Sequence, residues 1–565
     1  MDGVLIRLLP CIALFLISMG AFCADPSPGD LDWIRERQER LLEQQQQRLK
    51  ELQQLPGGRS DSPPPATPAD DSCYPIQRIH LQGANLLDAA QQRALVAPFE
   101  GRCLGIAQLN ELLKIVTQYY LDHGYVTSRA YLAEQDLSSG ELTLQVVEGR
   151  LEGLDSSALA SQRELAMAFP GHADGYLNLR ELEQLVDQLG RLPSRPAQLD
   201  LVPGTQVGGS RVRLSGEPMK PWRVSLSRHN EGQRSTGEQQ LALGLEWDSP
   251  LGLADQFGLR GSGDAVTDTW RHSASQSATY SIPYGWWRLD YSYNQSYYRT
   301  RVESSGQLFE SDGESKQHQL RVERVLHRDS LGKSAMNLGL AHLRTRNYIE
   351  NSLLQGSSNR LTELQLGFNH GRRVKNAFVN MDLGWQRGIG ALDAQRNERA
   401  RGSQPVSRYN KYSLTLSYLQ PFSFLGQSLS VDSLFNAQRS EDVLYSPQRI
   451  SLGGLSSVRG FKEQSLSGDS GYYWRNQVRW RHPVTWEALR PFVREYGLLL
   501  AYDRGAIKGT AYNTGQHGRV SGNAAEFSLR GEHMAVSLTL AHSLERPDAF
   551  AQRERPVHFR VDLFF

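Results

Sequence analysis

Residues 221–565 alternate apolar and polar positions over many short segments. In one segment Trp287, Leu289, Tyr291 and Tyr293 alternate with charged or small polar residues, and the pattern recurs at 241–247, 364–368, 379–385, 412–418 and 559–565. Successive side chains of a strand point to opposite faces, so this pattern predicts strands with one apolar face. A barrel with lipid outside and water inside fits the alternation, and so does a water-soluble β-sandwich. About 345 residues at about 21 per strand and connection predict roughly sixteen strands.

A helical period appears near the N-terminus. Apolar residues there recur at three- and four-residue steps or their multiples: Leu31, Ile34, Leu41, Leu49 and Leu52. They predict a helix ending near Leu55, with a thin apolar stripe because Gln38 and Gln45 interrupt it. Twenty-five helical residues span roughly 37 Å, close to the thickness of a bilayer with its headgroups. Such a helix suits a water-filled cavity, and a free or coiled-coil helix remains an equal alternative.

Between this helix and the alternating region, two segments show mixed periods. Residues 56–72 are mostly Pro, Gly, Ser and Asp, which predicts a flexible or extended linker. Residues 73–149 predict a strand at 76–81, helices at 86–99 and 106–123, and strands at 125–132 and 141–147. Residues 150–220 repeat this order more faintly, so two small α+β domains in tandem are expected.

The first 24 residues predict export. Arg7 precedes an apolar run from Leu8 to Phe22 and small residues before Asp25, the pattern of a cleaved signal peptide. No later apolar run approaches the ~18 residues that a spanning helix needs, so a membrane would have to be crossed by strands. Removing the signal peptide leaves Cys73 and Cys103, and an exported chain with a single cysteine pair is expected to form a disulfide.

Composition and motifs exclude several functions. The formal net charge is +1, so nothing points to a nucleic-acid partner. Gly468-Asp469-Ser470-Gly471 is similar to a trypsin-like nucleophile segment, but no matching histidine segment precedes it. Gly332-Lys333-Ser334 is similar to the end of a phosphate-binding loop whose first glycine is replaced by His327. We therefore expect no enzyme activity, no cofactor and no metal site.

One motif carries a family resemblance. Val458-Arg459-Gly460-Phe461, with residues 468–471 after it, resembles the signature loop of two-partner secretion transporters of the outer membrane. Further matches lie at 124–128, 135–137, 147–149 and the terminal Phe565. The resemblance implies that the loop near 450–472 folds back into a pore, where Arg459 pairs with an aspartate of a wall strand. Asp503 and Gly505 match the motif expected on that strand, whereas Ala501 stands where the family has an aromatic residue.

The resemblance covers nearly the whole mature chain and implies its organisation. We expect a membrane all-β protein with a signal peptide (1–24), a plug helix (25–55), a linker (56–72), two periplasmic polypeptide-transport-associated (POTRA) domains (73–149 and 150–220) and a transmembrane barrel (221–565). It would lie in the outer membrane of a Gram-negative bacterium and export a large partner exoprotein, bound through the POTRA domains, without ATP.

The resemblance also implies partners. Membrane lipid, periplasmic chaperones and the barrel-assembly machinery, which would read Phe565, are expected beside the exoprotein, and the transporter would be a monomer. The main alternative is a barrel-assembly insertase of the same superfamily, which usually has more POTRA domains and no leading helix. A passive porin would lack POTRA domains, and an outer-membrane enzyme would need a catalytic constellation that the sequence does not offer.

Overall fold

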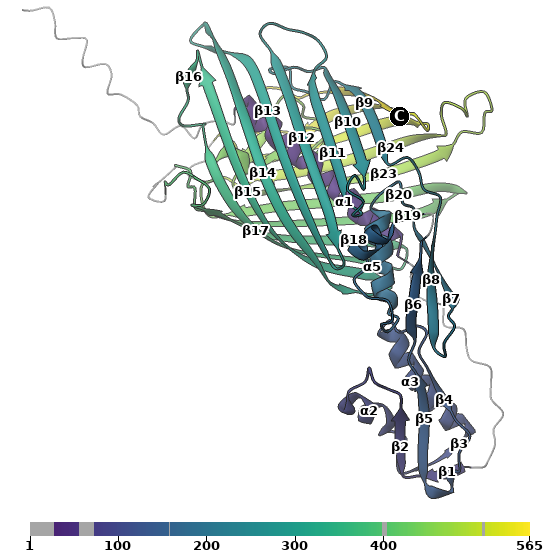
Figure 1. Ribbon diagram of the computed structural model, residues 1–565. Coiled ribbons are helices and arrows are strands. Elements are labelled where there is room, and N and C mark those ends of the chain that lie inside the picture. The colour runs from purple at the N-terminus through teal and green to yellow at the C-terminus, as the bar shows by residue number, and fades with distance from the viewer. Residues whose placement is uncertain (1–26, 56–72, 157–158, 398–403, 511–514) are drawn as a thin grey trace, which may run out of the picture.

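The computed structural model describes residues 27–55, 73–156, 159–397, 404–510 and 515–565. The predicted signal peptide and linker lie outside the described residues. A closed antiparallel barrel forms the C-terminal part, and the two α+β domains extend from one of its rims (Figure 1). Among the described helices, none has the length and apolar character needed to cross a membrane.

Sixteen long strands build the barrel, as the alternation predicted, and β27 pairs with β9 to close it. They are β9 (Trp222–His229), β10 (Gln240–Asp248), β11 (Gln256–Asp264), β12 (His272–Tyr284), β13 (Trp287–Ser304), β14 (Gln307–Arg328), β15 (Gly332–Ile349), β17 (Arg360–Val374), β18 (Ala377–Ile389), β19 (Asn410–Phe424), β20 (Gln427–Ser440), β23 (Gly471–Pro483), β24 (Glu495–Ile507), β25 (Gly518–Arg530), β26 (Met534–Glu545) and β27 (Val557–Phe564). A two-residue strand, β16 (Ser352–Leu353), extends the β15 edge.

The alternation fixes which face of each strand meets lipid. Trp287, Leu289 and Tyr291 are exposed on the outside of β13, whereas Asn294 and Tyr298, in the other register of the same strand, are buried in the interior. A soluble sandwich would have covered the apolar face, so the exposed aromatic and aliphatic side chains identify a lipid-facing wall. The barrel interpretation is therefore confirmed and the sandwich is excluded.

The first α+β domain contains β1 (Cys73–Ile76), β2 (Arg78–Gln82), α2 (Ala89–Val96), β3 (Arg102–Gly105), α3 (Ile106–Asp122), β4 (Arg129–Leu132), the 3₁₀ turn η1 (Leu137–Ser139) and β5 (Glu141–Val147). β2, β5 and β4 form its sheet, with α3 packed on one face through Leu109, Leu112 and Val116. The strand predicted at 76–81 is in fact two strands, and β3 was missed. At four residues, β3 is too short to show a period.

Cys73 and Cys103 form the predicted disulfide, with their Cα atoms 5.3 Å apart. The bond joins β1 to β3, the two-stranded ribbon at the end of the first domain farthest from the barrel (Figure 1).

Replacing both cysteines with serine should destabilise this domain by about 3–4 kcal/mol, the chain-entropy value for a loop of about 30 residues. Limited proteolysis of the whole protein, with and without reductant, measures this. Reductant should accelerate cleavage near β1 in the native protein and change nothing in the Cys73→Ser/Cys103→Ser variant. Equal cleavage of the native protein in both conditions would show that the disulfide contributes little.

The second domain contains β6 (Arg150–Asp155), α4 (Gln162–Ala168), α5 (Leu179–Gly190), β7 (Gln198–Pro203) and β8 (Gly209–Ser215). Its sheet order, β6-β8-β7 with β6 parallel to β8, repeats that of β2-β5-β4. The domain docks on the periplasmic turns of the barrel: Arg191 donates to the Ser281 hydroxyl at 2.6 Å and to the Ala254 carbonyl at 2.8 Å. Gln184 and Gln188 both donate to the carbonyl of Gly285.

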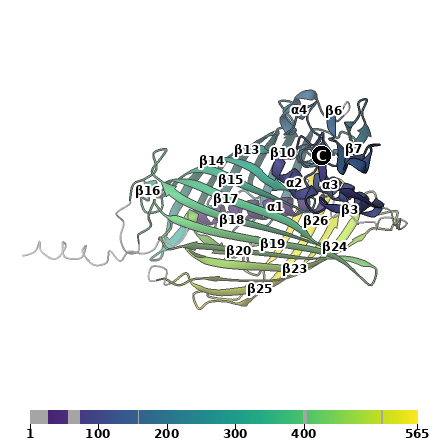
Figure 2. The ribbon, with the colours of Figure 1, turned by 90° about the horizontal axis from the view of Figure 1, so that it is seen from below.

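An N-terminal helix, α1 (Pro28–Gln53), lies inside the barrel (Figure 2). Ser27 caps it: the Asp30 amide donates to the Ser27 hydroxyl, the Ser27 amide donates to the Asp30 carboxylate, and Pro28 occupies the first turn. These are standard signals for a helix start, so the local sequence defines where α1 begins.

Candidate functional site

The loop between β20 and β23 folds into the barrel instead of standing out in solvent. It carries the 3₁₀ turn η2 (Ser446–Gln448) and a small hairpin of β21 (Ile450–Leu452) and β22 (Leu466–Gly468). Val458 and Phe461, two residues of the sequence motif, are almost fully buried at its tip. They pack with Tyr473, Val520 and Phe550 of the wall and of an outer loop. The tip is thus held in an apolar patch within a largely polar lumen.

Arg459, at the same tip, contacts both carboxylate oxygens of Asp503 on β24 through one edge of its guanidinium group. Its Nε donates to Oδ2 at 2.6 Å, its Nη2 donates to Oδ1 at 2.7 Å, and its backbone amide adds a third bond at 3.0 Å. The side chains are only 4% and 0% exposed. Such a two-pronged contact fixes both the position and the angle of the loop. The structure therefore brings together the arginine and the aspartate that the resemblance implied.

Two glycines of the motifs permit this close packing. A Cβ at Gly460, whose φ is +107°, would lie 2.7 Å from the carbonyl oxygen of His542 on β26. A Cβ at Gly505 would lie 2.8 Å from the Tyr472 carbonyl and 3.0 Å from a methyl carbon of Leu452 in the loop. Ala501, in place of the family's aromatic residue, lies in a small apolar cluster with Leu499 and stands opposite Gln477, whose side chain accepts from Arg459.

A second ion pair braces the loop within itself. Arg449 Nε donates to Asp469 Oδ1 at 3.2 Å, and the Leu444 amide donates to the same oxygen at 2.9 Å, with both charged side chains buried. Asp469 belongs to the segment that is similar to a protease nucleophile motif, and here it is a structural acceptor. Its partner Arg449 gave no signal in the sequence, because an arginine in a polar loop is usually solvated.

The predicted apolar residues of α1 are distributed along the lumen. Ile34, with Trp33, packs on Leu343 of β15, whereas Leu49, Leu52 and Leu55 pack on Phe378 of β18. Leu31 and Leu41 are only partly buried.

Polar side chains of α1 hold it to the inward loop. Arg37 donates to the carbonyl oxygens of Pro447 and Arg449. The amide of Gln38 donates to the Ser451 carbonyl at 2.6 Å and accepts from the Ser456 hydroxyl at 3.3 Å. α1 and the loop therefore form one hydrogen-bonded unit inside the barrel.

Gln45 and Arg48 bind α1 to the wall. Gln45 donates to Asp382 at 2.7 Å and accepts from Asn380 and Ser417. Arg48 pairs with Glu323 of β14 at 2.5 Å. Residues 31, 38, 45 and 52 are seven apart and share one face of α1, so the glutamines that interrupted the apolar stripe lie on the predicted face. They are polar because that face meets polar groups of the loop and the wall.

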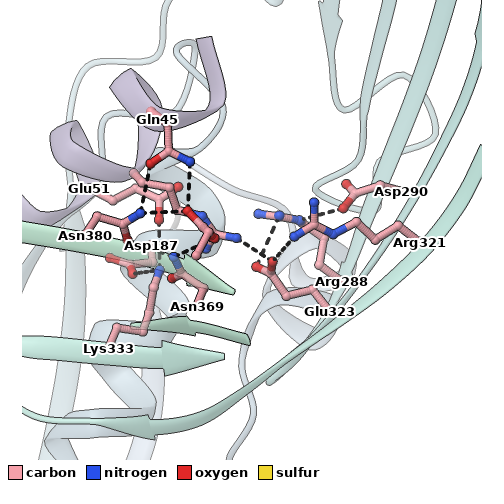
Figure 3. Close-up of polar contacts among 12 residues, drawn as sticks. Gln45, Glu51, Asp187, Arg288, Asp290, Arg321, Glu323, Lys333, Asn369 and Asn380 are labelled. Carbon is pink, nitrogen blue, oxygen red and sulfur yellow. Dashed lines mark hydrogen bonds and ion pairs between the residues drawn. The ribbon is translucent and has the colours of Figure 1, made fainter. Parts of the chain in front are cut away.

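At the periplasmic end, one lysine joins three parts of the chain (Figure 3). Lys333 Nζ lies 2.9 Å from the Glu51 carboxylate of α1 and 3.3 Å from the Asp187 carboxylate of α5. Arg328 pairs with the same Asp187 at 2.5 Å and with Glu183 at 3.2 Å. The end of α1, the barrel wall and the second α+β domain thus share one ionic junction. In the sequence, Lys333 belongs to the incomplete phosphate-loop motif, and no structural role was predicted for it.

Asp187 is ionised at neutral pH in this junction. Burial would raise its pKa, but Lys333 and Arg328 hold the pKa below its ordinary value. A lowered pKa in the folded state stabilises the docked domain above the unfolded pKa. That contribution is lost only as the pH falls through the lowered value, so the junction should persist at neutral pH.

Lys333→Met should weaken the junction, because it leaves two carboxylates close together without their shared cation. We expect more frequent channel openings in planar bilayers and faster proteolysis between the second domain and the barrel. Lys375→Met is the matched control, since Lys375 is exposed in the turn after β17. If Lys333→Met and Lys375→Met behaved alike in both assays, the junction would have no role in closing the lumen.

Within the described ranges, no group of His, Cys, Asp and Glu has the arrangement needed to hold a metal ion. The polar groups of the lumen bind one another, and their arrangement fits a closed passage.

Comparisons with known proteins agree with this geometry. Residues 208–529 match the family model described as haemolysin secretion/activation protein ShlB/FhaC/HecB. Residues 74–149 match the ShlB-type POTRA domain and residues 150–203 a further POTRA domain.

Individual relatives extend the similarity over almost the whole chain. The Outer membrane transporter CdiB of Escherichia coli O6:K15:H31 is 35% identical over 99% of this chain and 94% of its own length. The Hemolysin transporter protein HpmB of Proteus mirabilis is 29% identical over 93% of this chain and 91% of its own. A solved structure of CdiB from Escherichia coli superposes with a TM-score of 0.91 at 33% identity, covering 96% of this chain and all of that one. The chain therefore belongs to the haemolysin secretion/activation protein family ShlB/FhaC/HecB, the outer-membrane transporters of two-partner secretion.

Proposed function

We propose that this chain exports one large, unfolded exoprotein of the haemolysin or contact-dependent-inhibition class to the cell surface, without ATP. The observation that carries the proposal is a barrel whose lumen is occupied by α1 and by the inward loop of the same chain. α1 is the N-terminal helix of the described chain and is held in the lumen mainly by polar side chains. Residues 56–72 join it to the POTRA domains, which lie beyond the periplasmic rim. A passive porin needs none of these parts.

The exoprotein would first bind a POTRA domain by adding a strand to a free sheet edge. β2 and β4 are the outer strands of the first sheet, and β6 and β7 are those of the second. β4 displays Tyr131 and Leu132 to solvent, and β7 displays Leu201. Strand addition gives affinity through backbone hydrogen bonds and selectivity through alternate side-chain contacts, which suits an unfolded cargo.

α1 would act as the plug, and the loop carrying Arg459 as a gate that holds or changes position during passage. The Lys333 junction joins the plug to the second POTRA domain, so movement of α5 on cargo binding would weaken the hold on Glu51. Folding of the exoprotein outside would then make transport unidirectional. No step requires catalysis, so we propose that the chain is not an enzyme.

Membrane insertion of the transporter would rely on periplasmic chaperones and the barrel-assembly machinery, and we propose that Phe565 is part of the signal that the machinery reads. The Phe565 amide and carbonyl both bond to Val224, while its side chain is exposed. The terminal residue thus extends the pairing of β27 with β9 that closes the barrel, and its ring is exposed on the protein surface. The closed lumen of a single chain further supports a monomeric transporter.

Secretion of the polypeptide encoded beside this chain tests the proposed function. The partner should accumulate in the medium only when the transporter is produced, and other outer-membrane barrels should stay at their usual levels. Loss of those barrels on deletion of the gene, with the partner still secreted, would instead indicate a barrel-assembly insertase.

A further inference from the structure

Four cations gather on the outer face of the barrel at the extracellular side. Lys316 of β14, Arg344 of β15 and Arg360 of β17 stand directly opposite one another, because Lys316 pairs with Arg344 and Arg344 pairs with Arg360. Arg346 lies two residues beyond Arg344 and so on the same face. The three strands lie side by side (Figure 1). Like charges directly opposite on neighbouring strands destabilise a sheet, and a bound anion would relieve this repulsion.

The protein itself supplies too few anions at this place. Glu314, which stands directly opposite Arg346 in the register, binds Lys316 at 2.6 Å and also accepts from Gln295, and Asp393 binds Arg360. Four cations thus face two carboxylates. Arg344 and Arg346 are exposed, and across the described part of the chain neither guanidinium group has a hydrogen-bond or ion-pair partner. Two guanidinium groups remain available to an external ligand.

The position of the cluster tells which ligand can reach it. The outward residues in the middle of these strands are apolar, as at Leu320, Leu338 and Leu366. His318 and His342 form the next row, with the Tyr293 ring 4.9 Å from His318. The cations follow directly above. An apolar band, an aromatic row and a charged row in this order mark the outer interface of a membrane barrel.

The height agrees with this placement. Leu326 is the last exposed apolar residue of β14 before the periplasmic turn. Ten residues separate it from Lys316, but Leu326 is the extra residue of a β-bulge, so the distance along the strand is roughly 30 Å. At a tilt of about 35–45° this is about 21–24 Å of height, close to the usual thickness of the apolar band of an outer-membrane barrel. The cluster therefore lies at the level of the lipid headgroups in the outer leaflet.

We propose that Lys316, Arg344, Arg346 and Arg360 bind the phosphate groups of the phosphorylated glycolipid of the outer leaflet, lipopolysaccharide. Two adjacent interstrand spacings place the outer members of the row about 10 Å apart. The row can thus contact a bisphosphorylated disaccharide rather than a single small headgroup. Arginine binds phosphate through two parallel hydrogen bonds, and the two unpartnered guanidinium groups are suited to this contact.

Binding of defined lipids to the purified, detergent-solubilised protein, followed by native mass spectrometry, tests the proposal. The probes are bisphosphorylated lipid A, monophosphoryl lipid A, phosphatidylglycerol and inorganic phosphate. The native protein should bind bisphosphorylated lipid A most tightly, and Arg344→Gln/Arg346→Gln should weaken that binding by about tenfold or more. Arg439→Gln is the control, because Arg439 is an exposed, outward arginine paired with Glu441.

Three outcomes decide the matter. Weakened lipid A binding in the double variant alone supports the site. Unchanged binding in the double variant overturns it. Equally tight binding of phosphatidylglycerol or inorganic phosphate, affected equally by the substitutions, overturns the assignment to lipopolysaccharide. Heat-dependent mobility on gels reports whether each barrel is folded, and if the double variant is not folded, Arg346→Gln alone serves the same comparison.

Discussion

Arg459→Gln should reduce secretion of the partner exoprotein by about tenfold or more. The substitution leaves Asp503 fully buried without its cation, and breaking a buried ion pair in this way costs about 3–5 kcal/mol. The loop tip would then lose its fixed position against β24. Secreted partner per folded transporter, measured by immunoblotting of medium and outer membrane, gives the result.

Arg504→Gln is the matched control for this variant. Arg504 follows Asp503 on the same strand but points outward, where its guanidinium lies 4.9 Å from the Trp474 ring. We expect near-native secretion from Arg504→Gln and partial recovery from the exchange Arg459→Asp/Asp503→Arg. Similar secretion from Arg459→Gln and Arg504→Gln would show that the contact between loop and wall is dispensable.

Arg48→Met should open the pore. Arg48 and Glu323 are 5% and 6% exposed and form the shortest charged contact between α1 and the wall. Glu323 keeps Arg288 and Arg321 as partners in the variant, so the wall should stay folded while α1 loses its hold. We expect the mean conductance in planar bilayers to rise severalfold, toward that of a protein lacking residues 27–55.

The control for this opening is Lys50→Met, two residues away on the exposed side of α1. It removes the same unit of charge without touching the wall, and its conductance should stay at the native level. If Arg48→Met conducted no better than Lys50→Met, other contacts would suffice to keep α1 in place.

Alternation made the strands and their apolar face predictable, because residues such as Leu289 and Tyr291 share one face once their strand is paired, and the family resemblance implied that the strands close into a barrel. Short pairings escaped prediction. β3 has four residues, so only Cys103, through its expected disulfide, indicated that this segment meets β1. The three- and four-residue spacing predicted α1, but no local pattern could tell whether the helix was free or enclosed.

The parts of the site that could be predicted are those in which two sequence motifs supply the two partners of one contact. Arg459 and Asp503 were expected to meet through their motifs, and they do so in the structure. Arg449 and Lys333 were missed because their partners, Asp469 and Asp187, lie 20 and 146 residues away, and nothing in a single sequence links such distant charges. Gln38 and Gln45 interrupt the apolar stripe of α1 when only the helix sequence is considered. The hydropathy pattern of a helix contains no information about the polar loop and wall that these two residues contact.

A covalent tether between α1 and the wall tests most directly whether the plug must leave for transport. A Cβ at Gly371 of β17 would lie 3.0 Å from both methyl carbons of Leu52, so Leu52→Cys/Gly371→Cys should form a disulfide across the lumen. We predict that the oxidised variant assembles but secretes no partner, and that reduction restores secretion. Native protein treated with the same reductant controls for loss of Cys73–Cys103. Full secretion while α1 stays tethered would contradict the account.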